Sequence, residues 1–176
     1  TGFPYHINPL HAKPIPLDEL APITPEAEVQ DKRIEVNLTT QTLTAYENDK
    51  VVLKTLIASG IPNGSREANG IPTKTPAGEF RIMDKMPAKH MGNGNLFADF
   101  TDYELPGVPW TLFFTGQGHA FHGTYWHNDF GRPRRHGCIN LTPQAAKWLF
   151  RWTSPAVPPG KEFSYGYVGT KVEINV

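Results

Sequence analysis

The chain has 176 residues, of which 39% are apolar and 19% charged, a composition typical of one globular domain rather than of a disordered chain. Lys and Arg together number 17, and so do Asp and Glu, so the formal net charge is zero and gives no electrostatic reason to expect nucleic acid as a partner. No apolar run is long enough to cross a bilayer, so we expect no membrane span within this chain.

The 16 Gly and 17 Pro residues predict many turns and few long helices. The single cysteine, Cys138, excludes an internal disulfide framework, so composition alone does not fix the redox compartment. No signal peptide is visible, and the chain starts at Thr1 without a Met, as a mature or trimmed form would.

The first 31 residues differ in composition from the rest of the chain. Proline fixes φ and removes a hydrogen-bond donor, so a Pro-rich segment runs extended, without a sustained helix or central strand. We therefore predict an N-terminal extension or linker over residues 1–31, lying on the surface of a domain that spans 32–176. The prolines of the extension are Pro4, Pro9, Pro14, Pro16, Pro22 and Pro25.

Strand patterns dominate the remainder. In RIEVNL (33–38) apolar and polar residues alternate, which predicts a half-buried strand. Residues 42–60 read as strand, turn at 47–50, and strand. Further strands are expected at 78–86, entered through the turn Thr75–Gly78, and at 108–116, 118–124 and 170–176.

One helix is well signalled, immediately after residues 138–141. Thr142 is a suitable N-cap and Pro143 suits the first helical position. Apolar residues then recur at three- and four-residue spacing, which predicts one helical face: Ala145, Trp148, Leu149 and Trp152. The pattern as a whole predicts a mainly β domain with little helix.

The segment from Lys85 to Gly107 is rich in Gly and aromatic residues and is long for a loop. Loops of this length often serve as lids or binding loops, so we expect a lid here. The alternative is an ordinary excursion or a weak hairpin.

The stretch HGTYWHNDFGRPRRHGCINL (122–141) surrounds the only thiol with histidines. A thiolate is the nucleophilic form of cysteine, and a neighbouring imidazole generates it near neutral pH. The amides of Gly137 and Cys138 could serve an oxyanion, and we expect Arg132, Arg134 and Arg135 to favour the thiolate. The alternative for a lone cysteine is a small buried apolar residue.

A second chemical reading of the same stretch is a zinc site. The available ligands fit no established zinc spacing, and structural zinc sites use paired cysteines, so we expect no metal. These ligands would be His119, His122, His127, His136 and Cys138. For the remaining histidines, His6, His11 and His90, we expect only structural or surface roles.

Two segments, His122–Trp126 and Arg135–Leu141, resemble the signature of the L,D-transpeptidase catalytic domain. That family carries His-Gly or His-Ser, a variable stretch, then Ser/Thr-His-Gly-Cys, an aliphatic residue, and Arg or Asn. The strand at 33–38, Gly60 and TPAGEF (75–80) also look like the family, so the resemblance covers about residues 32–176. Arg135 stands where the family usually has Ser or Thr, which leaves the support of the loop and its substrate preference open.

The resemblance implies a fold and a set of catalytic roles. The fold would be a β-sandwich of mixed sheets with one or two short helices. Cys138 would be the nucleophile and His122 the general base and acid, oriented by the Gly123 carbonyl. Gly137 would contribute to the oxyanion hole, and His136 would support the loop.

Substrate contacts are implied for four further residues. Tyr125 and Trp126 would wall the substrate cleft. Asn140 would contact substrate, and Arg135 would help to hold a stem carboxylate, or would simply point to solvent.

The implied reaction is acyl transfer on peptidoglycan stem peptides. Loss of D-Ala leaves a thioester on the cysteine, and an amine of a second stem takes the acyl group to give a 3→3 cross-link. The alternatives are an L,D-carboxypeptidase that uses water and a peptidoglycan-binding module without turnover. The resemblance implies no cofactor and a bacterial cell-envelope location outside the cytoplasmic membrane, and we expect a monomer.

Overall fold

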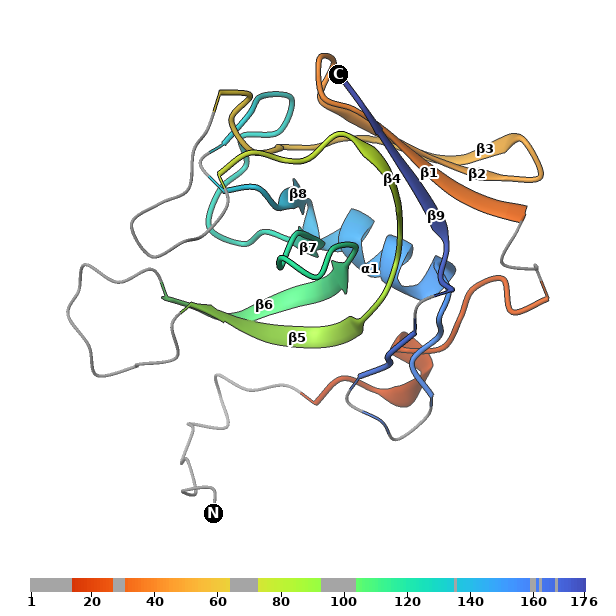
Figure 1. The fold of residues 1–176 in the computed structure, drawn as a ribbon. Coiled ribbons are helices and arrows are strands. Elements are labelled where there is room, and N and C mark those ends of the chain that lie inside the picture. Colours follow the sequence, from red (N-terminus) through yellow and green to blue (C-terminus); the bar gives the residue numbers. More distant parts are fainter. Residues whose placement is uncertain are drawn as a thin grey trace.

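The computed structural model describes residues 14–26, 31–63, 73–92, 104–134, 136–158, 161, 163–166 and 168–176. Two mixed β-sheets and one α-helix share a core, which confirms the predicted mainly β class (Figure 1). The first sheet has the strand order β3-β2-β1-β9-β4 and the second the order β5-β6-β7-β8. The elements are β1 (Lys32–Asn37), β2 (Thr42–Glu47), β3 (Lys50–Leu56), β4 (Gly78–Arg81), β5 (Lys85–Gly92), β6 (Glu104–Phe113), β7 (Ala120–Gly123), β8 (Ile139–Leu141), α1 (Pro143–Trp152) and β9 (Lys171–Asn175).

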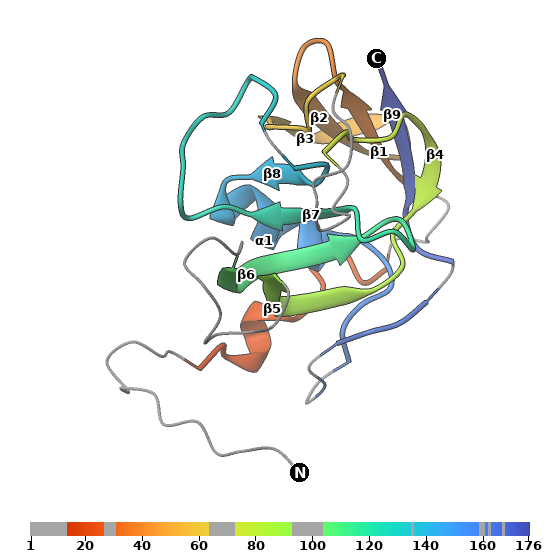
Figure 2. The ribbon, with the colours of Figure 1, turned by 60° about the vertical axis from the view of Figure 1, so that its left-hand side comes forward.

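Each sheet contains one parallel pair of strands. β1 is antiparallel to β2 but parallel to β9, and β7 is antiparallel to β6 but parallel to β8. The alternation expected in RIEVNL is confirmed, because Ile34 and Val36 are buried in the core while Arg33 and Glu35 are half-buried on the other face. α1 packs against β6, β7 and β8, behind the second sheet in Figure 2.

The helix begins where the sequence predicts. Thr142 caps it, with its side-chain oxygen accepting the Ala145 backbone N–H at 3.2 Å, and Pro143 is the first helical residue. The buried face of α1 consists of Ala146, Leu149, Phe150 and Trp152.

The strand prediction for 78–86 and the loop prediction for 85–107 are both wrong in part. β4 ends at Arg81, and a new strand, β5, begins at Lys85 in the other sheet. Residues 85–92 pair antiparallel with β6, which begins at residue 104, so only 93–103, outside the described residues, are left for a lid. Pro87 argued for a loop, but β5 is an edge strand, where a missing N–H costs no ladder bond. The short β8 was not predicted.

The described part of the N-terminal extension, residues 14–26, lies against α1. A carboxylate oxygen of Glu19 is 2.7 Å from the Lys147 ammonium, and the Arg151 guanidinium donates to the Ala21 carbonyl at 2.7 Å. A single 3₁₀ turn, Leu17–Glu19, is the only helical element of this stretch. No helix among the described residues has the length and apolar character to traverse a bilayer.

The segment after β3 leaves the first sheet and joins the second. Ala58 and Asn140 exchange backbone hydrogen bonds at 3.0 and 2.9 Å. Gly60 then approaches Gly137 so closely that a Cβ at Gly60 would lie 2.9 Å from the Gly137 Cα. The same Cβ would lie 2.3 Å from the Thr73 carbonyl oxygen and 2.8 Å from the Thr75 nitrogen.

Two buried lysines, one from each sheet, bind the C-terminal end of α1. The ammonium group of Lys32 donates to the carbonyl oxygens of Thr24 and Trp152, both at 3.0 Å. Lys85 donates to the Thr153 carbonyl at 2.7 Å. The C-terminal end of a helix leaves carbonyl oxygens without partners in the helix, and the N–H groups of the two lysines supply donors for them.

Lys85 is 1% exposed, and its ammonium lies 4.8 Å from the centre of the Phe150 ring. Burial, and then the charge of Lys32, lower the pKa of Lys85 to about 7. In the unfolded chain the pKa returns towards the ordinary value of 10.5. Between these two pH values the unfolded chain therefore binds a proton that the folded chain does not.

We expect the free energy of unfolding to rise with pH from about 7 towards 10.5 because of Lys85. Lys85→Met should remove this dependence, so the wild type should gain stability relative to the variant as pH rises. Urea unfolding over this range measures it, with Lys54→Met, an exposed lysine on β3, as the control. The same slope in the wild type and Lys85→Met would contradict the assignment.

Gly60→Ala should destabilise the protein by about 1–3 kcal/mol, because the new methyl group meets only backbone atoms, which cannot rotate away. The urea midpoint measures the loss. Gly116→Ala is the matched control, since nothing lies within 4 Å of a Cβ there, and it should change stability by less than about 0.5 kcal/mol. Equal effects of the two substitutions would disprove the close contact.

Candidate active site

The parallel strands β7 and β8 carry polar residues of the predicted site on one face. Phe121 pairs with Ile139 and His122 with Asn140. Phe121 and Ile139 are fully buried in the core, so His122 and Asn140 lie on the opposite face, because successive side chains of a strand alternate. The burial alternation continues back to Cys138, which is partly exposed. We call the side that carries Cys138, His122 and Asn140 the outer face.

His122 has a defined tautomer. Its Nδ1 lies 3.0 Å from the Gly123 carbonyl oxygen, and a carbonyl can only accept, so Nδ1 carries the hydrogen. Nε2 is left with its lone pair. The residue is 3% exposed, and burial lowers the pKa of His122 to about 4, with the charges of His127 and His136 acting in the same direction. The ring is therefore a neutral base at neutral pH.

Cys138 is also uncharged. Its sulfur lies 3.6 Å from the Gly118 carbonyl oxygen, to which the thiol donates. Although the residue as a whole is partly exposed, burial of the sulfur raises the pKa of Cys138 to about 11, and a hydrogen bond from the Ala120 backbone N–H opposes this only in part.

Arg132 and Arg134 do not have the expected effect on the thiol. Both Arg132 and Arg134 form ion pairs with the carboxylate of Asp129, the second at 2.6 Å. Their charges are thus compensated within the loop, and the pKa of Cys138 is raised rather than lowered. Arg135 lies outside the described residues.

The backbone before Cys138 is held by the segments that precede β4 and follow β3. The Thr75 hydroxyl donates to the Gly137 carbonyl at 2.9 Å and accepts the Gly60 backbone N–H at 2.8 Å. Gly137 is buried, and a Cβ there would lie 2.7 Å from the Lys74 carbonyl oxygen. From the sequence, Thr75 was predicted only as the first residue of a turn. Its position in TPAGEF, which resembles the family, could have indicated a role at the site.

His119 packs against the same glycine; from the sequence it was named only as a possible zinc ligand. Its Cδ2 would lie 2.9 Å from a Cβ at Gly137. Nε2 donates to the Lys74 carbonyl at 3.2 Å, so Nδ1 accepts from the Thr115 hydroxyl at 2.9 Å. The ring therefore connects the loop of Lys74 to the loop of Thr115 by hydrogen bonds. Nothing in the sequence distinguished it from the other histidines.

Of the two aromatic residues predicted beside the substrate, Trp126 lies beside His122 and Tyr125 packs against Trp126. The ring of Trp126 is centred 5.7 Å from the His122 ring, and Tyr125 packs edge-on against Trp126 at 4.8 Å. Tyr125 is 55% exposed and donates its hydroxyl to the Pro106 carbonyl at 2.8 Å. His136 is half-buried on the loop before Gly137.

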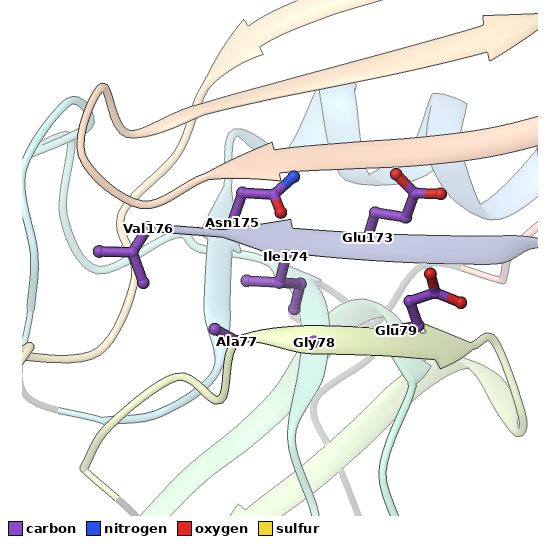
Figure 3. Close-up of a pocket in the computed structure, with 7 residues that line it drawn as sticks. All are labelled: Ala77, Gly78, Glu79, Glu173, Ile174, Asn175 and Val176. Carbon is purple, nitrogen blue, oxygen red and sulfur yellow. The ribbon is translucent and has the colours of Figure 1, made fainter.

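Two further features of the described residues were compared with this site. No group of three or more His, Cys, Asp or Glu residues in the described ranges is placed to hold a metal ion. A cavity between β4 and the end of β9 is lined by Glu79, Glu173 and Ile174, among others, and by none of the predicted site residues (Figure 3). Glu79 and Glu173 face each other there and share Lys171 as a counter-ion.

The sequence profile of the L,D-transpeptidase catalytic domain matches residues 31–174. An L,D-transpeptidase from Mycobacterium smegmatis is 22% identical, with a TM-score of 0.62 over 83% of this chain and 59% of its own. L,D-transpeptidase 3 from Mycobacterium tuberculosis, in complex with a faropenem-derived adduct, is 18% identical, with a TM-score of 0.60 over 83% and 60%. The catalytic domain of the Enterococcus faecium L,D-transpeptidase is 29% identical, with a TM-score of 0.56 over 84% and 99%. No curated protein matches the chain.

At these low identities the two mycobacterial structures show a shared fold, and this chain spans less than two thirds of their length. It spans nearly all of the isolated Enterococcus domain. The matched range 31–174 contains both sheets and the outer face with Cys138, His122 and Asn140. The chain belongs to the family of L,D-transpeptidase catalytic domains.

Proposed function

We propose that this protein is a cysteine-dependent L,D-transpeptidase of the bacterial cell envelope, acting outside the cytoplasm on peptidoglycan stem peptides. The observation that carries the proposal is the tautomer of His122. Its Nδ1–H is bound by the Gly123 carbonyl, so Nε2 is available as a base on the face that also carries the only thiol. We assign residues 32–176 to the catalytic domain and residues 1–31 to an N-terminal extension.

Acylation begins from an uncharged pair. The sulfur of Cys138 attacks the amide carbonyl between the diaminopimelate (or equivalent) residue and the terminal D-Ala. The thiol proton passes to Nε2 of His122 as the C–S bond forms, which avoids a buried free thiolate. His122 then gives this proton to the departing D-Ala nitrogen, the C–N bond breaks, and a thioester remains.

Deacylation uses the same base. Nε2 of His122 takes a proton from the side-chain amine of a second stem, and that amine attacks the thioester carbonyl. The C–S bond breaks, the new amide is the 3→3 cross-link, and the proton returns to the sulfur. With water in place of the amine the product would be a tripeptide, so mass spectrometry of products from a disaccharide-tetrapeptide distinguishes cross-linking from carboxypeptidase activity.

The oxyanion formed in both steps would be stabilised by the backbone N–H groups of Gly137 and Cys138. Support comes from the rigidity of this backbone, which the Thr75 hydroxyl and the contact with Gly60 hold in place. Preorganised donors of this kind stabilise a developing negative charge without reorganising. Trp126 beside His122 would shield the base from water, with His136 supporting the loop.

Cys138→Ala should abolish turnover with the fold retained, because no other residue offers a thiol. A carbapenem should add covalently to the wild type, as a penem-derived adduct does in the Mycobacterium tuberculosis structure. Intact-mass spectrometry with and without the drug detects the adduct. An adduct on Cys138→Ala, or turnover by this variant near the wild-type rate, would disprove the assignment.

His122→Ala should slow thioester formation by roughly 10²–10⁴-fold, the usual contribution of a general base. Stopped-flow measurement of acylation by a carbapenem gives the rate directly. His119→Ala is the matched control, a histidine whose two ring nitrogens bind Thr115 and Lys74 and take no proton in the mechanism. A larger loss in His119→Ala, at equal folded fraction, would reverse the assignment.

Alkylation of Cys138 by iodoacetamide should be slow at neutral pH and rise with pH, since the pKa of the free thiol is about 11. Below that pKa the thiolate fraction grows about tenfold per pH unit. The rate should therefore climb about a hundredfold over two units, whereas N-acetylcysteine reaches its plateau earlier. A Cys138 rate that levels off near pH 7 would show a resting thiolate.

A further inference from the structure

His127, in the variable stretch of the family signature, contacts a residue of the outer face. Its Nε2 lies 3.0 Å from Nδ2 of Asn140. Its Nδ1 lies 3.1 Å from the backbone nitrogen of Asp129, whose N–H donates to it. Asn140 is the register partner of His122 on β7, so this contact connects the loop to the proposed catalytic base.

The two ring nitrogens of His127 cannot both accept a hydrogen bond, one from Asp129 and one from Asn140. A neutral imidazole carries one N–H, and the backbone N–H of Asp129 can only donate, so Nδ1 is the bare nitrogen and Nε2 carries the hydrogen. A protonated ring would place a hydrogen on each nitrogen and oppose Asp129. Burial, and then the charge of Arg134, hold the pKa of His127 below its usual range, in agreement with a neutral ring.

A half-turn of the Asn140 carboxamide reconciles the contacts. Oxygen and nitrogen of an amide occupy almost equivalent positions, and exchanging them lets Nε2–H of His127 donate to Oδ1. The NH₂ group then points away from His127. Among the described residues, the Asn140 side chain has no other hydrogen-bond partner, and it is half-buried on the outer face.

We infer that His127 is a positioning residue: it fixes the carboxamide of Asn140 so that the NH₂ group donates to a carbonyl oxygen of the donor stem peptide. This inference rests on the proposed function for its substrate. A neutral carbonyl is the fitting acceptor, because the amide is uncharged and the nearby Arg132 and Arg134 are paired with Asp129.

The orientation can be tested without any turnover. Long-range ¹H–¹⁵N correlation spectra of the labelled wild type identify the protonated nitrogen of each imidazole, with His127→Ala as the assignment control. His127 should carry its hydrogen on Nε2, and His122 should carry its hydrogen on Nδ1, because it donates to Gly123. A His127 ring with its hydrogen on Nδ1 overturns the inference.

The consequence for substrate is tested with a pair of variants. His127→Gln keeps an N–H at the position of Nε2, whereas His127→Asn reaches only as far as Nδ1. We expect His127→Asn to raise KM for the tetrapeptide about five- to tenfold, the effect of one lost hydrogen bond, with a smaller change in kcat. His127→Gln should restore KM, and iodoacetamide should alkylate Cys138 at one rate in all three proteins.

Asn140→Asp provides an independent test of the same inference, because this variant keeps an oxygen towards His127 and loses the NH₂ group. It should raise KM as His127→Asn does, and the double variant should be no worse than either. Additive effects, or a His127→Gln variant as impaired as His127→Asn, overturn the inference. If the wild type has no transpeptidase activity, the proposed function fails, while the tautomer of His127 still decides the orientation of Asn140.

Discussion

The position of the thiol depends on one backbone contact between the segment that follows β3 and the loop that precedes β8. Gly60, at the end of the segment that follows β3, lies against Gly137, and the Thr75 hydroxyl binds both residues. A Cβ at Gly60 would meet the main chain of Gly137 itself, and a Cβ at Gly137 would meet the Lys74 carbonyl oxygen, so a side chain at either position would displace backbone atoms. Cys138 directly precedes β8 of the second sheet, but the backbone before it is held by the segments that follow β3 and precede β4 of the first sheet.

Main-chain atoms also fix the histidines around the thiol. A carbonyl orients His122, another carbonyl orients His119, and an amide N–H orients His127. Main-chain groups in packed loops move less than a carboxylate side chain and bring no charge. Burial keeps both His122 and Cys138 uncharged at neutral pH. The proposed mechanism therefore starts from a neutral base and a neutral thiol, in contrast to sites in which a permanent ion pair prepares the nucleophile.

Sequence patterns predicted most of the fold where local chemistry decides structure. The alternation of 33–38 and the cap at Thr142 are local signals, and both are confirmed. β5 agrees with the alternative of a hairpin, which was not preferred because Pro87 is tolerated only in an edge strand. β8 was missed because three residues are too few for a pattern. The histidine tautomers and the paired arginines were likewise unpredictable, since Asp129 and the relevant carbonyls become neighbours only through the loop's path.

Lys32 and Lys85 connect the two sheets to the C-terminal end of α1. Lys32 is the first residue of β1 and Lys85 the first of β5, yet they bind the consecutive carbonyls of Trp152 and Thr153. Neither sheet can therefore detach without breaking these hydrogen bonds and leaving the buried amino group of a lysine without its acceptor. Local opening should be confined to loops, and amide hydrogens of both sheets should exchange through one shared, global unfolding event.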